Sequence, residues 1–181
     1  MNIKDLFIKS LYSIKAISFF RFQKIEKTIS YLFLLSFLVS LPTLILFFIS
    51  LFSQGGIETY FEFSMMAEED GTAGIIPVFI FLFILFTIIG ISMVQFLTVS
   101  LLAAIGLLIK QWMKRKLDYK HLWNMSAYAV TLPAIIIGLS ALLPVSLSFP
   151  AIIYFLLSLT ILTLAIRKVP IPKRGMSKKP L

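Results

Sequence analysis

Residues 75–109 form a run of 35 residues without a charged side chain. A run this long indicates a membrane-spanning helix, because about 20 apolar residues cross the ~30 Å hydrocarbon core of a bilayer. Of the 181 residues, 59% are hydrophobic and 14% are charged, and none is cysteine. A soluble domain usually has about 45–50% apolar and about 25% charged residues. These values exclude an ordinary soluble enzyme, a disordered protein and a disulfide scaffold.

We expect an all-α membrane protein with four transmembrane helices, at residues 31–52, 75–109, 122–143 and 151–166. The second run would be about 52 Å long as one helix, so two short spans with a turn near Gly90 are an alternative. Five basic residues lie between 110 and 120. One crossing keeps them on the side of the N-terminal cations, as the positive-inside rule favours. We therefore predict one long span, tilted or bent around Gly90 to Ser92.

The basic residues fall into three groups, with six in residues 1–30, five in 110–120 and six in 167–181, which accounts for all 17. The loop 53–74 holds five of the eight acidic residues and no basic one. This pattern predicts that both termini are cytoplasmic, that 53–74 is an outer loop and that 167–181 is a disordered tail. The net charge of +9 then reflects topology in a multi-pass protein of the cytoplasmic (plasma) membrane, and we predict no nucleic-acid partner.

Residues 1–30 precede the first span as a separate segment. Ile3, Phe7, Leu11 and Ile14 recur at helical spacing, which predicts an amphipathic helix in the membrane interface. A helix packed on the cytoplasmic ends of the spans is a compatible alternative. The predicted partner is a bilayer with anionic headgroups. Its expected contacts are Lys4, Lys9, Lys15, Arg21, Lys114, Arg115 and Lys116.

The apolar parts of the spans contain no Asp, Glu, Lys, Arg or His, which argues against proton-coupled transport. His121 is the only histidine and cannot form a metal cluster alone. An intramembrane enzyme would need Asp118 and His121 to converge on a substrate. We predict no enzymatic activity, no metal site and no cofactor.

Small residues in the second and third spans predict close helix packing, either within the bundle or against another membrane protein. They are Ser100, Ala103, Ala104 and Gly106, then Ala127, Thr131, Ala134 and Gly138. The mid-span prolines, Pro42 and Pro133, predict kinks in their helices. The polar candidates inside the spans are Gln95, Asn124 and Tyr128. Ser40-Leu41-Pro42 matches Thr131-Leu132-Pro133, through either a parallel hairpin repeat or chance.

Three stretches carry a family resemblance: Phe7-Ile-Lys-Ser-Leu-Tyr12 with Phe20-Arg21-Phe22, Lys27-Thr-Ile-Ser-Tyr31, and Leu117-Asp-Tyr119 through Trp123-Asn124 to Tyr128-Ala-Val-Thr-Leu-Pro133. Through them the chain resembles, over nearly its whole length, the DUF1189 family of bacterial integral membrane proteins of unknown function. Some relatives are labelled maltodextrin-utilisation proteins, and the last stretch is loosely similar to the Yip family of trafficking membrane proteins. Relatives usually carry a larger external segment between the first two spans. The resemblance implies no catalytic residues.

We therefore hypothesise a non-enzymatic membrane protein that is an accessory or scaffold for a transport or envelope system, with another membrane protein as its partner. The resemblance implies sugar or maltodextrin uptake as that system. The alternative is a small transporter or channel subunit for a neutral or lipidic solute, with Pro42, Pro133, Gln95 and Asn124 lining its path.

Overall fold

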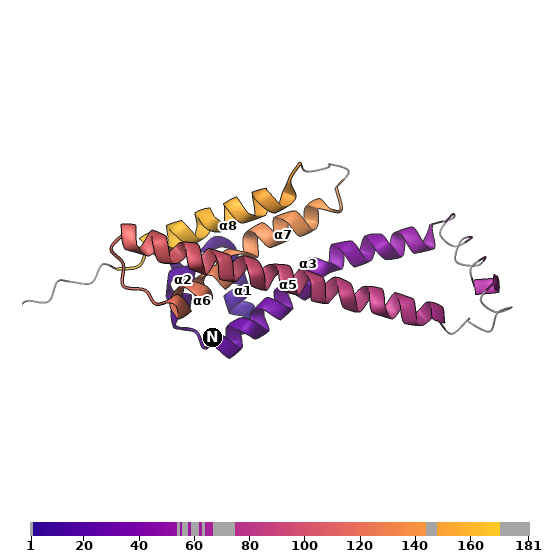
Figure 1. Cartoon of the computed structure of the whole chain (residues 1–181), viewed down its shortest axis with the longest axis horizontal. Coiled ribbons are helices and arrows are strands. Elements are labelled where there is room, and N and C mark those ends of the chain that lie inside the picture. The colour runs from indigo at the N-terminus through magenta and orange to yellow at the C-terminus, as the bar shows by residue number, and fades with distance from the viewer. Residues whose placement is uncertain are drawn as a thin grey trace, which may run out of the picture.

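The computed structural model describes residues 2–53, 55, 58, 62, 64–66, 75–143 and 148–170. Most of the predicted outer loop and the tail from residue 171 lie outside these ranges. Within them, every element is a helix (Figure 1): α1 (Ile3–Tyr12), α2 (Ile14–Phe19), the 3-10 turn η1 (Phe20–Phe22), α3 (Ile25–Phe52), α5 (Ile75–Trp112), α6 (Tyr119–Ala129), α7 (Thr131–Ser140) and α8 (Pro150–Arg167).

Four helical segments are long and apolar enough to cross a membrane: α3, Pro77–Trp112 of α5, α6 with α7, and α8. The chain is thus an all-α, multi-pass membrane protein. We call the end with Lys110 to Lys120 and Arg167 the basic end, and the opposite one the far end. Figure 1 shows α2 and α6 at the basic end, and α3 and α5 continuing past α7 and α8 toward the far end.

The N-terminal segment packs on the bundle. The Asn2 carboxamide oxygen accepts the Ile3 amide at 2.8 Å, and Asp5 accepts the Asn2 amide at 3.3 Å, so a capping box starts α1. Ser13 ends α1 and caps α2. Leu6 and Ser10 are buried, because α1 contacts α3, α6 and α7. This supports the packed alternative.

The predicted apolar face of the N-terminal helix borders its buried side. Ile3, Phe7 and Ile14 are partly buried and pack against the core, and the break at Ser13 separates Ile14 from the other two. The spacing identified a helix, but a tertiary contact moves its buried side by about one residue, toward Leu6 and Ser10.

The first two predicted spans are each one continuous helix. α3 begins at Ile25, six residues before the predicted start at Tyr31, because its polar first turn extends beyond the apolar run. α5 runs through Gly90 without interruption, so the single long helix is confirmed and the alternative of two short spans is wrong. α5 stops where Lys114 takes a left-handed conformation (φ 52°) and the Arg115 amide donates to the Lys110 carbonyl, a Schellman motif.

The two mid-span prolines lie in different local structures. Pro42 lies inside α3, which continues past it as one helix. Pro133 lies just after a break at Val130, and its missing N–H leaves the Ala129 carbonyl without its helical partner. Both tripeptides are helical, but residues 40–42 lie inside α3 whereas residues 131–133 form the first turn of α7 after a break. This difference favours chance over an internal repeat.

Candidate functional site

A chain of buried hydroxyl groups joins the N-terminal segment to the spans near the basic end. The Tyr31 hydroxyl lies 3.0 Å from Ser10 Oγ and 2.6 Å from Thr131 Oγ1. Ser10 also donates its single proton to the Phe7 carbonyl at 2.7 Å. Tyr31 therefore donates to Ser10, and Thr131 donates to Tyr31. This ordered chain ties α1, α3 and α7 together.

Tyr128 extends the same buried cluster toward η1. Its ring centroid lies 4.6 Å from that of Tyr31 and 4.7 Å from that of Phe20, and its hydroxyl lies 3.4 Å from Thr28 Oγ1. Tyr128 and Tyr31 are fully buried. The sequence singled out Tyr128 as a polar candidate, and the structure places it in the packed core rather than on a solute path.

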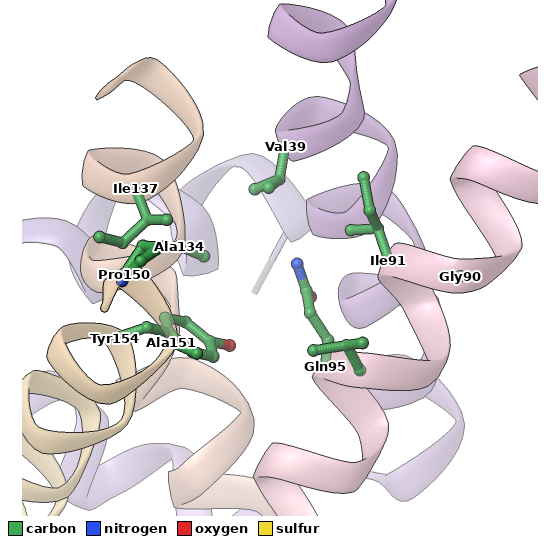
Figure 2. A pocket seen from close by; sticks show the side chains of 10 residues that line it. Val39, Gly90, Ile91, Gln95, Ala134, Ile137, Pro150, Ala151 and Tyr154 are labelled. Atoms are coloured by element: carbon green, nitrogen blue, oxygen red, sulfur yellow. The ribbon is translucent and has the colours of Figure 1, made fainter. Parts of the chain in front are cut away.

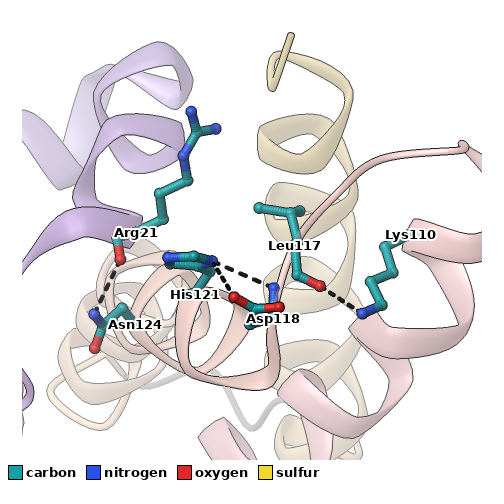
Figure 3. Close-up of polar contacts among 6 residues, drawn as sticks. All are labelled: Arg21, Lys110, Leu117, Asp118, His121 and Asn124. Carbon is teal, nitrogen blue, oxygen red and sulfur yellow. Dashed lines mark hydrogen bonds and ion pairs between the residues drawn. The ribbon is translucent and has the colours of Figure 1, made fainter. Parts of the chain in front are cut away.

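Asn124 binds the backbone where the N-terminal segment turns into α3. Its side-chain nitrogen donates to the Arg21 carbonyl at 3.3 Å (Figure 3) and to the Gln23 carbonyl at 2.8 Å. The Arg21 carbonyl belongs to η1 and the Gln23 carbonyl to the link that follows it, so the intrahelical bonds of α3 do not satisfy them. Asn124 is fully buried and fixes this corner of the fold.

The basic cluster after α5 makes intramolecular contacts. Lys110 Nζ donates to the Leu117 carbonyl (Figure 3). The Arg115 guanidinium donates to the Val169 carbonyl and, at 3.1 Å, to that of Arg167, so it caps the C-terminus of α8. Arg115 is therefore engaged by α8, in contrast to its predicted role as a headgroup contact.

The other predicted headgroup contacts are accessible to different degrees. The Arg21 guanidinium lies 4.4 Å from the centre of the Phe22 ring and is only partly exposed. The remaining ones are all exposed, namely Lys4, Lys9, Lys15, Lys114 and Lys116.

Asp118 and His121 do converge, but as the cap of α6. The Asp118 amide donates to His121 Nδ1 at 3.3 Å, and Asp118 Oδ2 lies 3.6 Å from the same nitrogen (Figure 3). The contact of the Asp118 amide belongs to a capping box at the start of α6, and the Asp118 carboxylate faces the same ring nitrogen. This geometry favours a structural role for the pair.

Most of the predicted small residues pack inside the bundle. A Cβ added to Gly106 would lie 3.2 Å from a Leu122 methyl group, and one added to Gly138 would lie 3.3 Å from Val39 Cγ1. Small side chains thus let α5 approach α6, and α7 approach α3. Ala103, Ala127, Thr131 and Ala134 are buried too, whereas Ser100 is partly exposed and Ala104 is exposed. The small residues of α6 and α7 therefore form a contact inside the bundle.

The four predicted path-lining residues are not brought together in one pocket. Gln95 lines a pocket between α3, α5, α7 and α8 with a volume of about 340 Å³ (Figure 2). Pro42 lines a separate groove with Phe7 of α1. Asn124 is hydrogen bonded at the basic end, and Pro133 is buried in α7.

Gln95 shares its pocket with Tyr154 of α8, which the sequence analysis missed. Both side chains extend into the pocket in Figure 2. Gln95 is 3% exposed, and neither Gln95 Oε1 nor the Tyr154 hydroxyl has a hydrogen-bond partner in the part of the chain that the structure describes. A tyrosine in a short span whose interior has no charged residue was the available signal.

Comparison with known protein families identifies the family of this chain. The family described as "Protein of unknown function (DUF1189)" matches residues 5–58 and 57–166, nearly the whole length. The chain belongs to the DUF1189 family. No curated protein and no solved structure matches.

The DUF1189 match is divided at residues 57–58, within the segment between α3 and α5. From the resemblance, we expect relatives to carry a longer segment between the first two spans. The family description carries no activity, so the site has to be judged from its own geometry.

Proposed function

We propose that this DUF1189 protein is a non-enzymatic accessory subunit or scaffold that docks on another membrane protein through the outer halves of α3 and α5. We call these residues, 45–52 and 77–89, the α3–α5 arm. The observation that carries the proposal is the length and exposure of this arm.

The apolar part of α5 is longer than a bilayer core. Residues 75–109 span about 52 Å as a helix, and a tilt of about 40°, the upper end of the usual range, leaves about 40 Å along the membrane normal. The hydrocarbon core is ~30 Å thick. Lipid tails therefore leave about 10 Å of apolar helix uncovered.

The excess lies in the arm, where α3 and α5 extend past α7 and α8 (Figure 1). Phe47 and Phe83 stack there with ring centroids 4.2 Å apart. The outward side chains are large, apolar and exposed, among them Ile49, Phe52, Phe79, Phe81 and Phe86. A continuous apolar surface of this kind is typical of a site for another apolar partner. We therefore assign the surface to the transmembrane helices of another protein.

The other hypotheses have less support. Asp118 and His121 cap a helix, which supports a non-enzymatic role. A solute path through Pro42, Pro133, Gln95 and Asn124 lacks its common cavity. The label of some relatives directs the search for the partner first to sugar and maltodextrin uptake.

Photocrosslinking in native membranes tests the proposal. A photoreactive residue replaces Phe79 or Phe86, which lie two turns apart on one face of α5, and the matched control position is Leu156, an exposed apolar residue of α8. We expect the same identified membrane protein from both arm positions, a reciprocal crosslink from that protein, and no such product from Leu156. Lipid adducts alone, or dimers of this chain, would overturn the accessory role.

A further inference from the structure

The pocket that holds Gln95 combines apolar walls with two unsatisfied polar groups. Its lining comes from Val39 of α3, Gly90, Ile91, Val94 and Gln95 of α5, Ala134 and Ile137 of α7, and Pro150, Ala151 and Tyr154 of α8 (Figure 2). Except for Gln95 and Tyr154, all the lining side chains are apolar. A volume of about 340 Å³ lies within the range of small-molecule sites, about 300–1,000 Å³.

The two polar groups are costly where they lie. Gln95 Oε1 and the Tyr154 hydroxyl are buried without a hydrogen-bond partner. A polar group in an apolar environment loses its bonds to water and, without a replacement, lowers stability. Elsewhere in the bundle the buried hydroxyls of Tyr31 and Tyr128 have partners. Three other buried atoms also lack a partner among the described residues, namely Arg115 Nε, Asn124 Oδ1 and Ser126 Oγ. The two orphan groups of Gln95 and Tyr154 differ from these because they belong to residues that line one common pocket, where a bound molecule can supply the missing hydrogen bonds.

The mouth of the pocket faces the bilayer. Gly90 and Val94 on α5 and Pro150 and Ala151 on α8 are exposed, whereas Gln95 and Ala134 at the bottom are buried. A molecule dissolved in the membrane can thus enter sideways between α5 and α8. A second pocket shares Val39, Ile91, Ile137 and Pro150 with the first and continues it to Thr43 and Ser140. This extension gives room for an alkyl chain.

We propose that this pocket binds an uncharged lipid that carries a hydroxyl group, such as a long-chain alcohol. A hydroxyl group matches both orphans in kind, because it can donate to Gln95 Oε1 and can accept from the Tyr154 hydroxyl. No side chain of the lining is charged at neutral pH, so an ionised headgroup would lack a counter-charge. The site is separate from the α3–α5 arm and does not depend on the accessory role.

Photolabelling of the full-length protein in nanodiscs tests the proposal directly. The probe is a twelve-carbon alcohol with a diazirine in its chain, and the comparison probes are the matching alkane and fatty acid. We expect the alcohol to label residues that line the pocket on α5, α7 and α8. Gln95→Leu and Tyr154→Phe should each reduce this labelling about fivefold, because each removes one hydrogen bond. Labelling by the alkane should not change.

The controls separate binding from folding. Ser92→Ala is the matched variant, because Ser92 is a buried polar residue of α5 that bonds the Ile88 carbonyl outside the pocket; it should label like the wild type. Gly90→Leu should narrow the mouth, since a Cβ there meets nothing within 4 Å, and should reduce labelling without unfolding.

Thermal unfolding gives a second readout. Without ligand, Gln95→Leu should melt at or above the wild-type temperature, because it removes an orphan acceptor. 1-Dodecanol should raise the melting temperature of the wild type and not that of Gln95→Leu/Tyr154→Phe. Equal labelling of the wild type and the double variant, or stronger labelling by the fatty acid, would overturn the proposal.

Discussion

Removal of the Tyr31 hydroxyl should release α1 from the bundle. Tyr31→Phe deletes the bonds to Ser10 and Thr131 and keeps the ring contact with Tyr128. Hydrogen bonds between helices in membranes contribute about 0.6 kcal/mol each on average. The Thr131 donor is also left buried and unpaired, which costs about 1 kcal/mol more. The expected loss of overall stability is therefore about 2 kcal/mol. Of these bonds, only the one between Ser10 and Tyr31 joins α1 to the bundle, so the population with α1 detached should rise by the equivalent of about 0.6 kcal/mol, or about threefold.

Cysteine labelling can measure this population, because the chain has no native cysteine. Leu6→Cys places a thiol at a fully buried position of α1, and Ile8→Cys places one at a position that is 52% exposed. In nanodiscs, Tyr31→Phe should speed maleimide labelling at position 6 about threefold and leave labelling at position 8 unchanged, because only the buried site must open first.

The direction of the hydrogen bonds gives a stricter criterion. Thr131→Val removes a donor that binds Tyr31 and leaves the Tyr31 bond to Ser10 intact. It should therefore speed labelling at position 6 less than Tyr31→Phe does. Rates within twofold of the wild type in Tyr31→Phe, or a larger effect of Thr131→Val, would refute the ordered chain.

Three further predictions concern packing, capping and topology. Gly138→Leu should destabilise the protein by about 1–3 kcal/mol in thermal unfolding, because its side chain meets Val39; a neutral result would contradict the close approach of α3 and α7. Arg115→Ala should cost about 1–3 kcal/mol by losing two bonds to the end of α8, whereas Lys116→Ala should be nearly neutral; equal losses would argue against the cap. A topology reporter after Gly71 should be outside and one after Lys116 inside, and two reporters on the same side would exclude the predicted orientation.

The long apolar helices were predictable because they depend on runs of apolar residues that are local in the sequence and on the number of charged residues in each loop. The single helix through Gly90 followed from the side on which Lys110 and its neighbours must lie. Gly106 and Gly138 followed from the spacing of small residues, and both prove to be contact points. In each case the prediction needed only residues that are close in the sequence, or the distribution of charges along the chain.

Contacts between distant segments were not predictable in this way. The position of α1 depends on the bond between Ser10 and Tyr31, 21 residues apart. The pocket depends on Gln95 and Tyr154 meeting from different helices, and an apolar span conceals the role of one tyrosine. Likewise, Pro42 and Pro133 follow the same pattern, yet only the second lies beside a break, since neighbouring helices decide whether the break is stabilised.

The N-terminal segment makes a polar helix compatible with a membrane bundle. α6 buries the polar side chains of Asn124, Ser126 and Tyr128. If these side chains faced lipid, their polar groups would have no hydrogen-bond partners. Phe20 covers the Tyr128 ring, and the carbonyls of the link before α3 accept the Asn124 amide. The segment thus gives the Asn124 side-chain nitrogen and the Tyr128 ring protein partners in place of lipid, whereas Asn124 Oδ1 and Ser126 Oγ have no hydrogen-bond partner among the described residues. The four-helix bundle therefore depends on residues that precede its first span, and the 1–30 segment is a structural part of the domain.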